Sequence, residues 1–373
     1  MKEWITPVLV IVGLIIVGFG IRALIIKKSV NNPDIAATEQ AAGEQKGSGT
    51  SVENLPKGEG NPNDKGPKEG DEKEKPRTNP GDPEDWEEQN HPFQGYPPES
   101  APDKEIMIKF AKARAEHPQD DMVAIAEGDF SMGDDAISMS SPSRRVFVKA
   151  FKVMRYEVTN ALYQKFVKDT GHRQPELLDD WAVQYSWREQ TYPKGTGDLP
   201  VTLVSQKDAQ AYCKWADMRL PTEIEWEKAA RGTRGNRFPW GNEWDGRKAH
   251  TVERFSGALK NDQDWSDFVE KHEKEEGTGS MFRAFPVGSY PEDRSEYGVH
   301  DLHGNVSEWV DGTFDSYEGG KKEASLLFGK DTVAIVRGNS FANRDYAASS
   351  AVRYPFMREH FDGSIGFRCA IDD

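Results

Sequence analysis

The chain has 373 residues and a formal net charge of −15, which excludes a nucleic-acid backbone as its main partner and favours cations or basic protein surfaces. Only 36% of the residues are hydrophobic, and most of the apolar and aromatic ones lie after residue 120, so we expect one sizeable folded domain. The 10 tryptophans and 34 glycines favour a loop-rich fold held by aromatic anchors over a helical bundle or a regular α/β sheet.

The amino-terminal segment, residues 1–28, contains an apolar run long enough to span a bilayer. Residues 4–26 are almost entirely apolar apart from Arg22, and the run ends at Lys27 and Lys28 without a small-residue cleavage site close behind it. We therefore expect a retained single-pass membrane anchor rather than a cleaved signal peptide. The basic cluster after the run opposes export by the positive-inside rule, but the bias is small, and we predict that the C-terminal domain is extracytoplasmic, either periplasmic or extracellular.

A polar segment separates this anchor from the expected domain. Residues 29–103 are rich in Gly, Pro and charged residues and nearly free of large aliphatic ones, so they cannot bury enough surface to offset their ordering entropy. We expect a disordered acidic linker there. The spacing of apolar residues in 104–118 predicts a short helix. The folded domain is then expected to span residues 119–373.

Within the domain, three helices are predicted from capping residues at their first turns. Each start has a threonine or serine, and two of them have an acidic residue three positions later, which forms a capping box. The starts are at Thr159, at Ser205 with Asp208, and at Thr222 with Glu225, and glycines at 171 and 232 are expected to end the first and third helices. Alternating apolar residues over 146–153 predict a strand.

The segment 297–310, YGVHDLHGNVSEWV, combines turn formers with two carboxylates. Asp301 and Glu308 are hard oxygen donors, and we expect Gly304 to adopt a positive φ that turns the carbonyls of Gly304 and Val306 toward the same point. These four residues predict a calcium site. The alternative is a plain turn before a strand, in which the polar side chains bond to their own backbone.

Five further segments occur in a characteristic order. They are MVAIAEGDFSMG (122–133), RLPTEIEWE (219–227), FPWGN (238–242), RGNSF (337–341) and GFRCA (366–370). Together with the segment 297–310 they resemble the formylglycine-generating enzyme, or sulfatase-modifying factor, family. The resemblance runs from about residue 122 to the C-terminus. It implies a compact α+β fold related to C-type lectins, with little regular secondary structure, and it agrees with a structural calcium ion at the segment 297–310.

The resemblance also locates the family's catalytic cysteines, which bind copper and activate oxygen. The matching positions here are Asn343 and Ala348, so no copper is expected, because copper(I) selects soft thiolates. The two cysteines that the chain does contain, Cys213 and Cys369, stand where the family carries a structural disulfide. The alternative is a pair of buried free thiols.

A related branch of the family binds iron through histidines. No cluster with ligand spacing supports such a centre here, and His300 with His303 predicts polar packing rather than a metal site.

The sequence therefore predicts a membrane-anchored, non-catalytic protein that serves as a binding or assembly subunit of an envelope complex, with a protein or peptide partner and no nucleic acid. The alternative is an enzyme of the formylglycine-generating type or another oxidoreductase. The expected ligand face lies on the segment that matches the family's active-site loop. It comprises Asn343, Arg344, Tyr346, Arg353 and Tyr354.

Overall fold

The structure is a computed structural model of the chain, and it describes residues 118–179, 182–253, 263–264, 267–268, 283–320, 333–343 and 349–373. The predicted membrane anchor (1–28), the linker (29–103) and all but the last residue of the predicted helix 104–118 lie outside the described residues. Among the helices that the structure describes, none is both long and apolar enough to cross a membrane.

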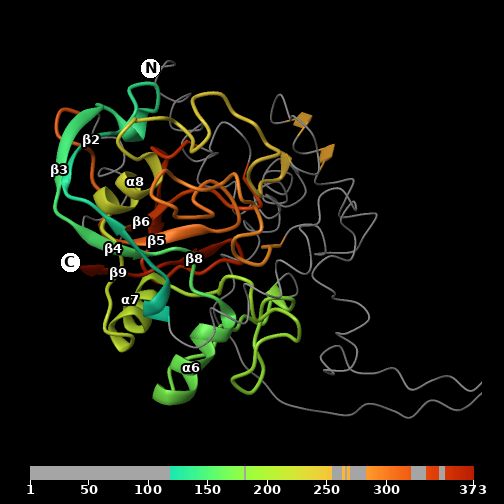
Figure 1. Cartoon of the computed structure of the whole chain (residues 1–373). Helices are drawn as coiled ribbons and strands as arrows, with labels where there is room; N and C mark the ends of the chain where they lie inside the picture. The colour runs from blue at the N-terminus through green and yellow to red at the C-terminus, as the bar shows by residue number, and fades with distance from the viewer. Residues whose placement is uncertain are drawn as a thin grey trace, which may run out of the picture. The chain divides into compact units, whose positions relative to one another are not determined.

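The described strands form three small sheets, which gives the chain an α+β architecture. The first sheet is antiparallel and has the order β1 (Met122–Ile125), β4 (Phe151–Met154) and β9 (Ala370–Asp372). The second pairs β2 (Gly128–Met132) with β3 (Arg144–Val148). The third has the order β7 (Arg353–Met357), β6 (Val333–Arg337), β5 (Ser307–Thr313) and β8 (Ile365–Phe367), in which only β5 and β8 run parallel. Figure 1 shows β4 beside β9. Because β1 also pairs with β4, the first and last strands of the domain lie in one sheet.

The predicted strand 146–153 is in fact two strands. Its first part belongs to β3 and its second part to β4, with residues 149–150 between them. The reason is that β3 pairs with β2 whereas β4 pairs with β1 and β9, so the chain changes sheets at this point.

The three predicted helices are confirmed as α6 (Asn160–Thr170), α7 (Gln206–Trp215) and α8 (Glu223–Arg231). The Thr159 hydroxyl accepts from the Leu162 N–H, and both predicted capping boxes are present. Gly171 ends α6 in the left-handed conformation, with φ 69°. Two short 3₁₀ helices, Pro118–Asp121 and Ser138–Ser140, are also described.

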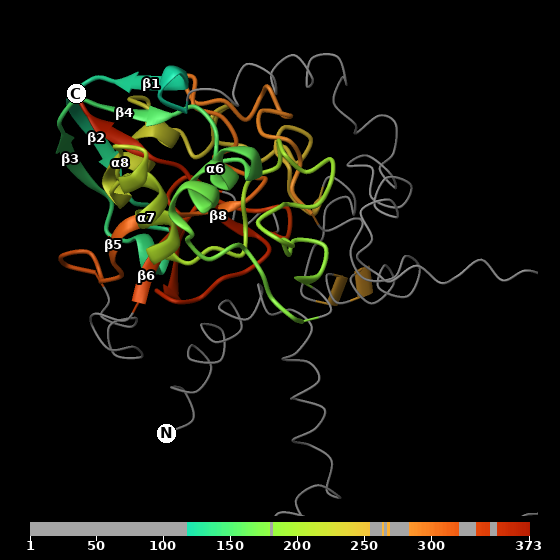
Figure 2. The same cartoon turned by 90° about the horizontal axis from the view of Figure 1, so that it is seen from below.

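The hydrophobic core has two main parts. One lies around α6, α7 and β8, and the other around β1 to β4, α8, β5 and β6. Helix α8 contacts β2, β3, β5 and β6, whereas α6 packs against α7, as the view from below shows (Figure 2). The strands do not form one extended sheet in the described residues, and α8 packs against strands of two different sheets.

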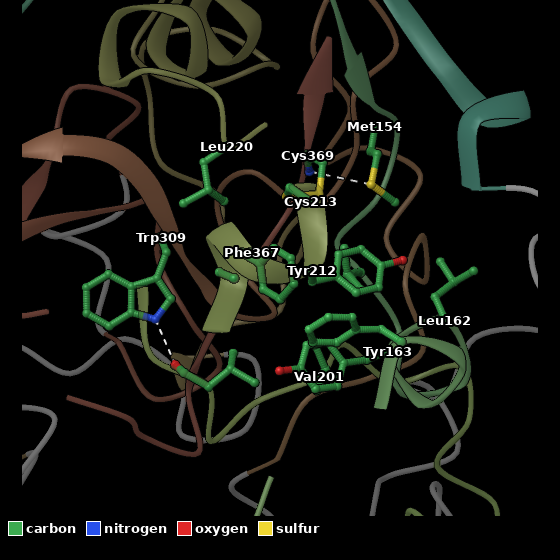
Figure 3. Close-up of a cluster of buried hydrophobic side chains, with 14 of the residues drawn as sticks. Met154, Leu162, Tyr163, Val201, Tyr212, Cys213, Leu220, Trp309, Phe367 and Cys369 are labelled. Carbon is green, nitrogen blue, oxygen red and sulfur yellow. Dashed lines mark hydrogen bonds between the residues drawn. A yellow bond between two sulfur atoms is a disulfide. The ribbon is translucent and has the colours of Figure 1, made fainter. Parts of the chain in front are cut away.

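A disulfide joins Cys213 on α7 to Cys369 between β8 and β9, with 5.7 Å between their Cα atoms, and this confirms the pairing implied by the resemblance. Figure 3 shows it in the first core part, beside the rings of Tyr163, Tyr212 and Phe367. The rings of Tyr163 and Tyr212 stack with centroids 5.5 Å apart. The cross-link therefore holds the last strands against α7.

Candidate functional site

The segment 300–308 leads into β5, and two of its residues adopt left-handed backbone conformations. These are Asp301 with φ 59° and Asn305 with φ 66°. The prediction of a positive φ at Gly304 is wrong, because this glycine is not among those with a positive φ. A glycine is needed at this position for a different reason. A Cβ atom at position 304 would lie 2.6 Å from the backbone nitrogen of His250, so only glycine allows the two segments to approach this closely.

Asn305 links four segments that are far apart in the sequence. Its backbone N–H donates to the carbonyl of His250 at 2.9 Å, and its own carbonyl accepts from the N–H of Phe341 at 2.8 Å. Its side-chain oxygen accepts from the N–H of Phe285 at 2.8 Å, and its amide donates to Glu157 at 3.1 Å. This residue is 3% exposed, and its four hydrogen bonds hold the loop against the other segments.

Glu308, predicted as a calcium ligand, is fully buried and paired with Arg368. The guanidinium donates from Nε to Oε2 and from Nη2 to Oε1, both at 2.7 Å. The indole N–H of Trp226 also donates to Oε2, at 2.9 Å. Both oxygens of this carboxylate are therefore engaged by charge-assisted or neutral hydrogen bonds within the protein.

Two more carboxylates belong to the same cluster. Asp301 accepts from the N–H of Gly288, and Glu157, which the sequence had not singled out, is 1% exposed with its Oε2 atom lacking a hydrogen-bond partner. Burial, and next the negative charge of Asp301, raise the pKa of Glu157 well above its ordinary value, whereas Arg368 acts in the opposite direction. Three carboxylates thus face one guanidinium.

This cluster fits a calcium ion in part. The excess of negative charge and the unpartnered oxygen of Glu157 suit a hard cation, which takes carboxylate and carbonyl oxygens. In the described part of the chain, however, no three His, Cys, Asp or Glu side chains converge as a metal-binding group. An ion held by Asp301, Glu308 and the carbonyls of Gly304 and Val306 would have to share Glu308 with Arg368.

The segment that matches the family's catalytic loop starts at Arg337. It has no cysteine at the position that matches the first catalytic cysteine of the family. Asn343 occupies that position, and its side-chain oxygen accepts from the N–H of Ser340 at 2.8 Å and from its hydroxyl at 2.7 Å. The second matching position, Ala348, lies outside the described residues. The chain contains two cysteines, and both are in the disulfide.

Of the five residues of the expected ligand face, the structure describes Asn343, Arg353 and Tyr354, and these three do not form one exposed surface. Arg344 and Tyr346 lie outside the described residues, and Tyr354 is half-buried with its hydroxyl 3.3 Å from Asn339. The expectation that Arg353 belongs to an exposed ligand face is wrong, because its side chain is 2% exposed and points inward. Its Nη2 atom donates to Glu223 at 2.8 Å, so its charge is used inside the protein.

A buried relay of three polar side chains was not found from the sequence. His303 has Nδ1 2.9 Å from Asp293 and Nε2 2.6 Å from the hydroxyl of Ser350, which donates to the carbonyl of Arg237 at 3.0 Å. The order resembles the Asp–His–Ser triad of hydrolases, but all three side chains are buried, so no substrate reaches the hydroxyl. The relay confirms the polar packing expected for His303. No sequence motif connects positions so far apart.

Comparisons with known proteins identify the family of the chain. Residues 109–373 match the model of the sulfatase-modifying factor enzyme 1-like domain. The chain is 30% identical to the formylglycine-generating enzyme of Bos taurus, over 68% of this chain and 75% of that protein. It is 28% identical to the inactive C-alpha-formylglycine-generating enzyme 2 of Bos taurus, over 67% of this chain and 87% of that protein.

A further relative is the hercynine oxygenase of Mycolicibacterium smegmatis, 29% identical over 65% of this chain and 59% of that protein. Among solved structures, PvdO from Pseudomonas aeruginosa shares the fold, with a TM-score of 0.50 and 24% identity over 68% of this chain and 94% of that one. A relative named as the formylglycine-generating enzyme and one named as inactive match to a similar extent, so membership alone does not decide activity. The chain belongs to the sulfatase-modifying factor enzyme 1-like domain family, as its motifs had indicated.

Proposed function

We propose that this chain is a non-catalytic member of the family that acts as a binding or assembly subunit for a protein or peptide partner. The observation that carries the proposal is the use of both cysteines of the chain in the Cys213–Cys369 disulfide. Without a further thiol, the segment after Arg337 has no thiolate pair to hold copper.

The proposed location is a membrane, with anchoring through residues 4–26 and an extracytoplasmic C-terminal domain. Two features support this location. The apolar run is long enough to span a bilayer, and a structural disulfide persists in an oxidising compartment. An envelope complex is the setting that combines an anchor, a long polar linker and an exported binding domain.

The proposed ligand face is the segment around Asn343, Arg344, Tyr346 and Tyr354. Its support comes from the two ends of that segment, which are firmly held. Arg337 precedes it and is paired with Glu227 at 2.6 Å, and Arg353, next to Tyr354 at the other end, is paired with Glu223. A loop held at both ends by buried charges is a suitable place for variable contact residues.

A structural calcium ion at Asp301, Gly304, Val306 and Glu308 is part of the proposal. Its support is the excess of carboxylates in the cluster and the unpartnered oxygen of Glu157. An ion that binds only the folded chain would stabilise it by about 2.7 kcal/mol at a hundredfold excess over its dissociation constant. Chelation should then lower the melting temperature of the purified chain.

An activity assay tests the absence of catalysis. The purified chain is incubated with a Cys-x-Pro-x-Arg peptide, copper and reductant, and the product is analysed by mass spectrometry, with the bovine formylglycine-generating enzyme as positive control. We expect no aldehyde from this chain. Formation of the aldehyde would overturn the proposal and support the alternative of a formylglycine-generating enzyme or another oxidoreductase. Co-purification from native membranes then identifies the partner.

A further inference from the structure

The two-stranded sheet of β2 and β3 has an open edge at β3. Among the described residues, β3 pairs only with β2 and has no backbone hydrogen bond to any other segment. Both views show β3 as the outer strand of the pair (Figure 1, Figure 2). Because a strand directs its N–H and C=O groups to both sides, about half of those of β3 are available at this edge. An extended segment can therefore add there as a further strand.

Three exposed side chains follow one another along this edge at alternate positions. They belong to Arg145, Phe147 and Lys149, whereas Val148 between the last two is buried. Phe147 is 59% exposed, and it is the one aromatic residue among the exposed large hydrophobic residues that the structure describes. In the same part of the chain, the side chains of Arg145 and Lys149 have no ion pair or hydrogen bond. The row therefore presents an apolar ring between two available cations.

Two simpler roles explain this row less well. Charged residues on an open edge can serve only to prevent pairing with other chains, but an exposed aromatic residue between them favours association. A lipid surface would also suit cations beside a ring, but it offers no series of N–H and C=O groups to the backbone of β3. A peptide offers both a backbone that can pair and side chains that can match the row.

We propose that the open edge of β3 binds an extended segment of a protein partner, in which an apolar residue lies between two acidic ones at alternate positions. The apolar residue would lie opposite Phe147 and the acidic ones opposite Arg145 and Lys149, since facing residues of neighbouring strands share one side of a sheet. In a chain of net charge −15, two such cations select for an acidic partner. The inference rests on the proposed function for the existence of a partner.

Two acidic residues, Glu127 and Asp129, are exposed beside this row. Asp129 lies on β2 opposite Phe147, and Glu127 directly precedes β2, so both lie on the side of β3 away from its open edge. A bound segment would be two strand spacings from β2, about 10 Å, and a single spacing of about 5 Å from β3. Charges at the longer distance are largely screened at physiological ionic strength. Arg145 and Lys149 therefore set the charge preference.

The test uses the purified full chain and two capped, fluorescently labelled peptides, TETVTET and TKTVTKT, which share the alternation and carry opposite charges. Binding is measured by fluorescence anisotropy. We expect TETVTET to bind about tenfold more tightly than TKTVTKT, because two facing pairs change from opposite to like charge. Equal binding of the two peptides, or no binding of either, would overturn the proposal. Binding to phosphatidylglycerol vesicles without binding of TETVTET would assign the row to a lipid surface and would also overturn it.

A charge reversal on β3 locates the site. The double substitution Arg145→Glu with Lys149→Glu should weaken binding of TETVTET by about tenfold and make TKTVTKT the tighter peptide. The matched control, Lys168→Glu with Lys214→Glu, makes the same change of net charge at exposed positions of α6 and α7 and should leave the preference unchanged. An unreversed preference in the β3 variant, or a reversal in the control, would refute the site. The comparison of the two peptides on the unsubstituted chain decides independently of how any variant folds.

The chain's own residues Glu84, Trp86 and Glu88 have the same alternation of acidic and apolar side chains. A second form of the full chain, with Glu84→Gln, Trp86→Ala and Glu88→Gln, is therefore measured in parallel. Similar binding of TETVTET to both forms supports a partner as the ligand. Binding to the substituted form alone would assign the edge to the chain's own segment and overturn the partner.

The outcomes of this test and of the activity assay are separate. An aldehyde in the activity assay would overturn the non-catalytic function and leave the peptide preference of β3 unaffected. Indifference to the charge of the peptides would overturn the assignment of β3 and leave the proposed binding function in place.

Discussion

The ion pair between Glu308 and Arg368 makes a sharp prediction about stability. Both side chains are fully buried, and the pair is joined by two hydrogen bonds of 2.7 Å. Glu308→Gln keeps the shape but removes the charge, so Arg368 would remain buried without its direct partner. Breaking a buried pair in this way costs about 3–5 kcal/mol. Because Glu157 and Asp301 also act on Arg368, we expect a loss near the lower end, about 3 kcal/mol.

Urea unfolding followed by tryptophan fluorescence measures this loss, in calcium and in chelator. With the ion pair as the main contribution, Glu308→Gln destabilises the chain under both conditions. The matched control is Glu359→Gln, since Glu359 pairs with Lys207 at the surface, where both side chains are more than half exposed, and its unfolding midpoint should stay at the wild-type value. A wild-type midpoint for Glu308→Gln in chelator would refute the reasoning, and a loss seen only in calcium would assign Glu308 to the metal alone.

Three other changes have expected outcomes. Replacing Cys213 and Cys369 by serine removes a cross-link between residues 156 apart in the sequence. The chain-entropy model gives this cross-link about 5 kcal/mol of stability, so denaturant unfolding of the double variant should show a loss of this order in the free energy of unfolding. Burial alone would raise the pKa of Asp208, but hydrogen bonds at the start of α7 and a neighbouring arginine lower it. Its contribution to stability is therefore complete above the unfolded value of 3.8 and is lost as the pH falls through the lower folded value, so Asp208→Asn should be destabilising near neutral pH and should flatten the urea midpoint against pH below about 4. Gly304→Ala should lower the melting temperature strongly, because its Cβ atom would meet the backbone of His250, whereas Gly171→Ala, where the space is open, should cost only about 1 kcal/mol.

Local features of this fold could be predicted from the sequence, because the interactions that define them join neighbouring residues. A capping box connects positions three apart, and those at Ser205 and Thr222 form as expected. The family motifs supplied the fold and the disulfide, since they report on a whole domain at once. Both kinds of signal are independent of how a particular side chain packs.

Features that depend on long-range packing could not be predicted. Arg353 faces inward because β7 pairs with β6 and because its guanidinium donates to Glu223 on α8, which lies 130 residues earlier in the sequence. Gly304 is needed because the backbone of His250 passes beside it, and no pattern in the segment 297–310 reveals that approach. The contact of His303 with Ser350 is of the same kind. In each case the decisive partner belongs to another part of the chain.

The two ends of the segment that matches the family's catalytic loop are anchored on one helix, and this arrangement would keep the fold stable under the proposed loss of the family's chemistry. Glu223 and Glu227 are four residues apart and therefore share one face of α8. Glu227 binds Arg337 at the start of the segment, and Glu223 binds Arg353 at its end. Glu227 also pairs with Arg231 at 3.1 Å, so the anchor is a cluster of buried ion pairs on one helix. Since Asn343 takes no part in these pairs, a substitution at this position should leave the supports intact, as the proposed binding role of the segment requires.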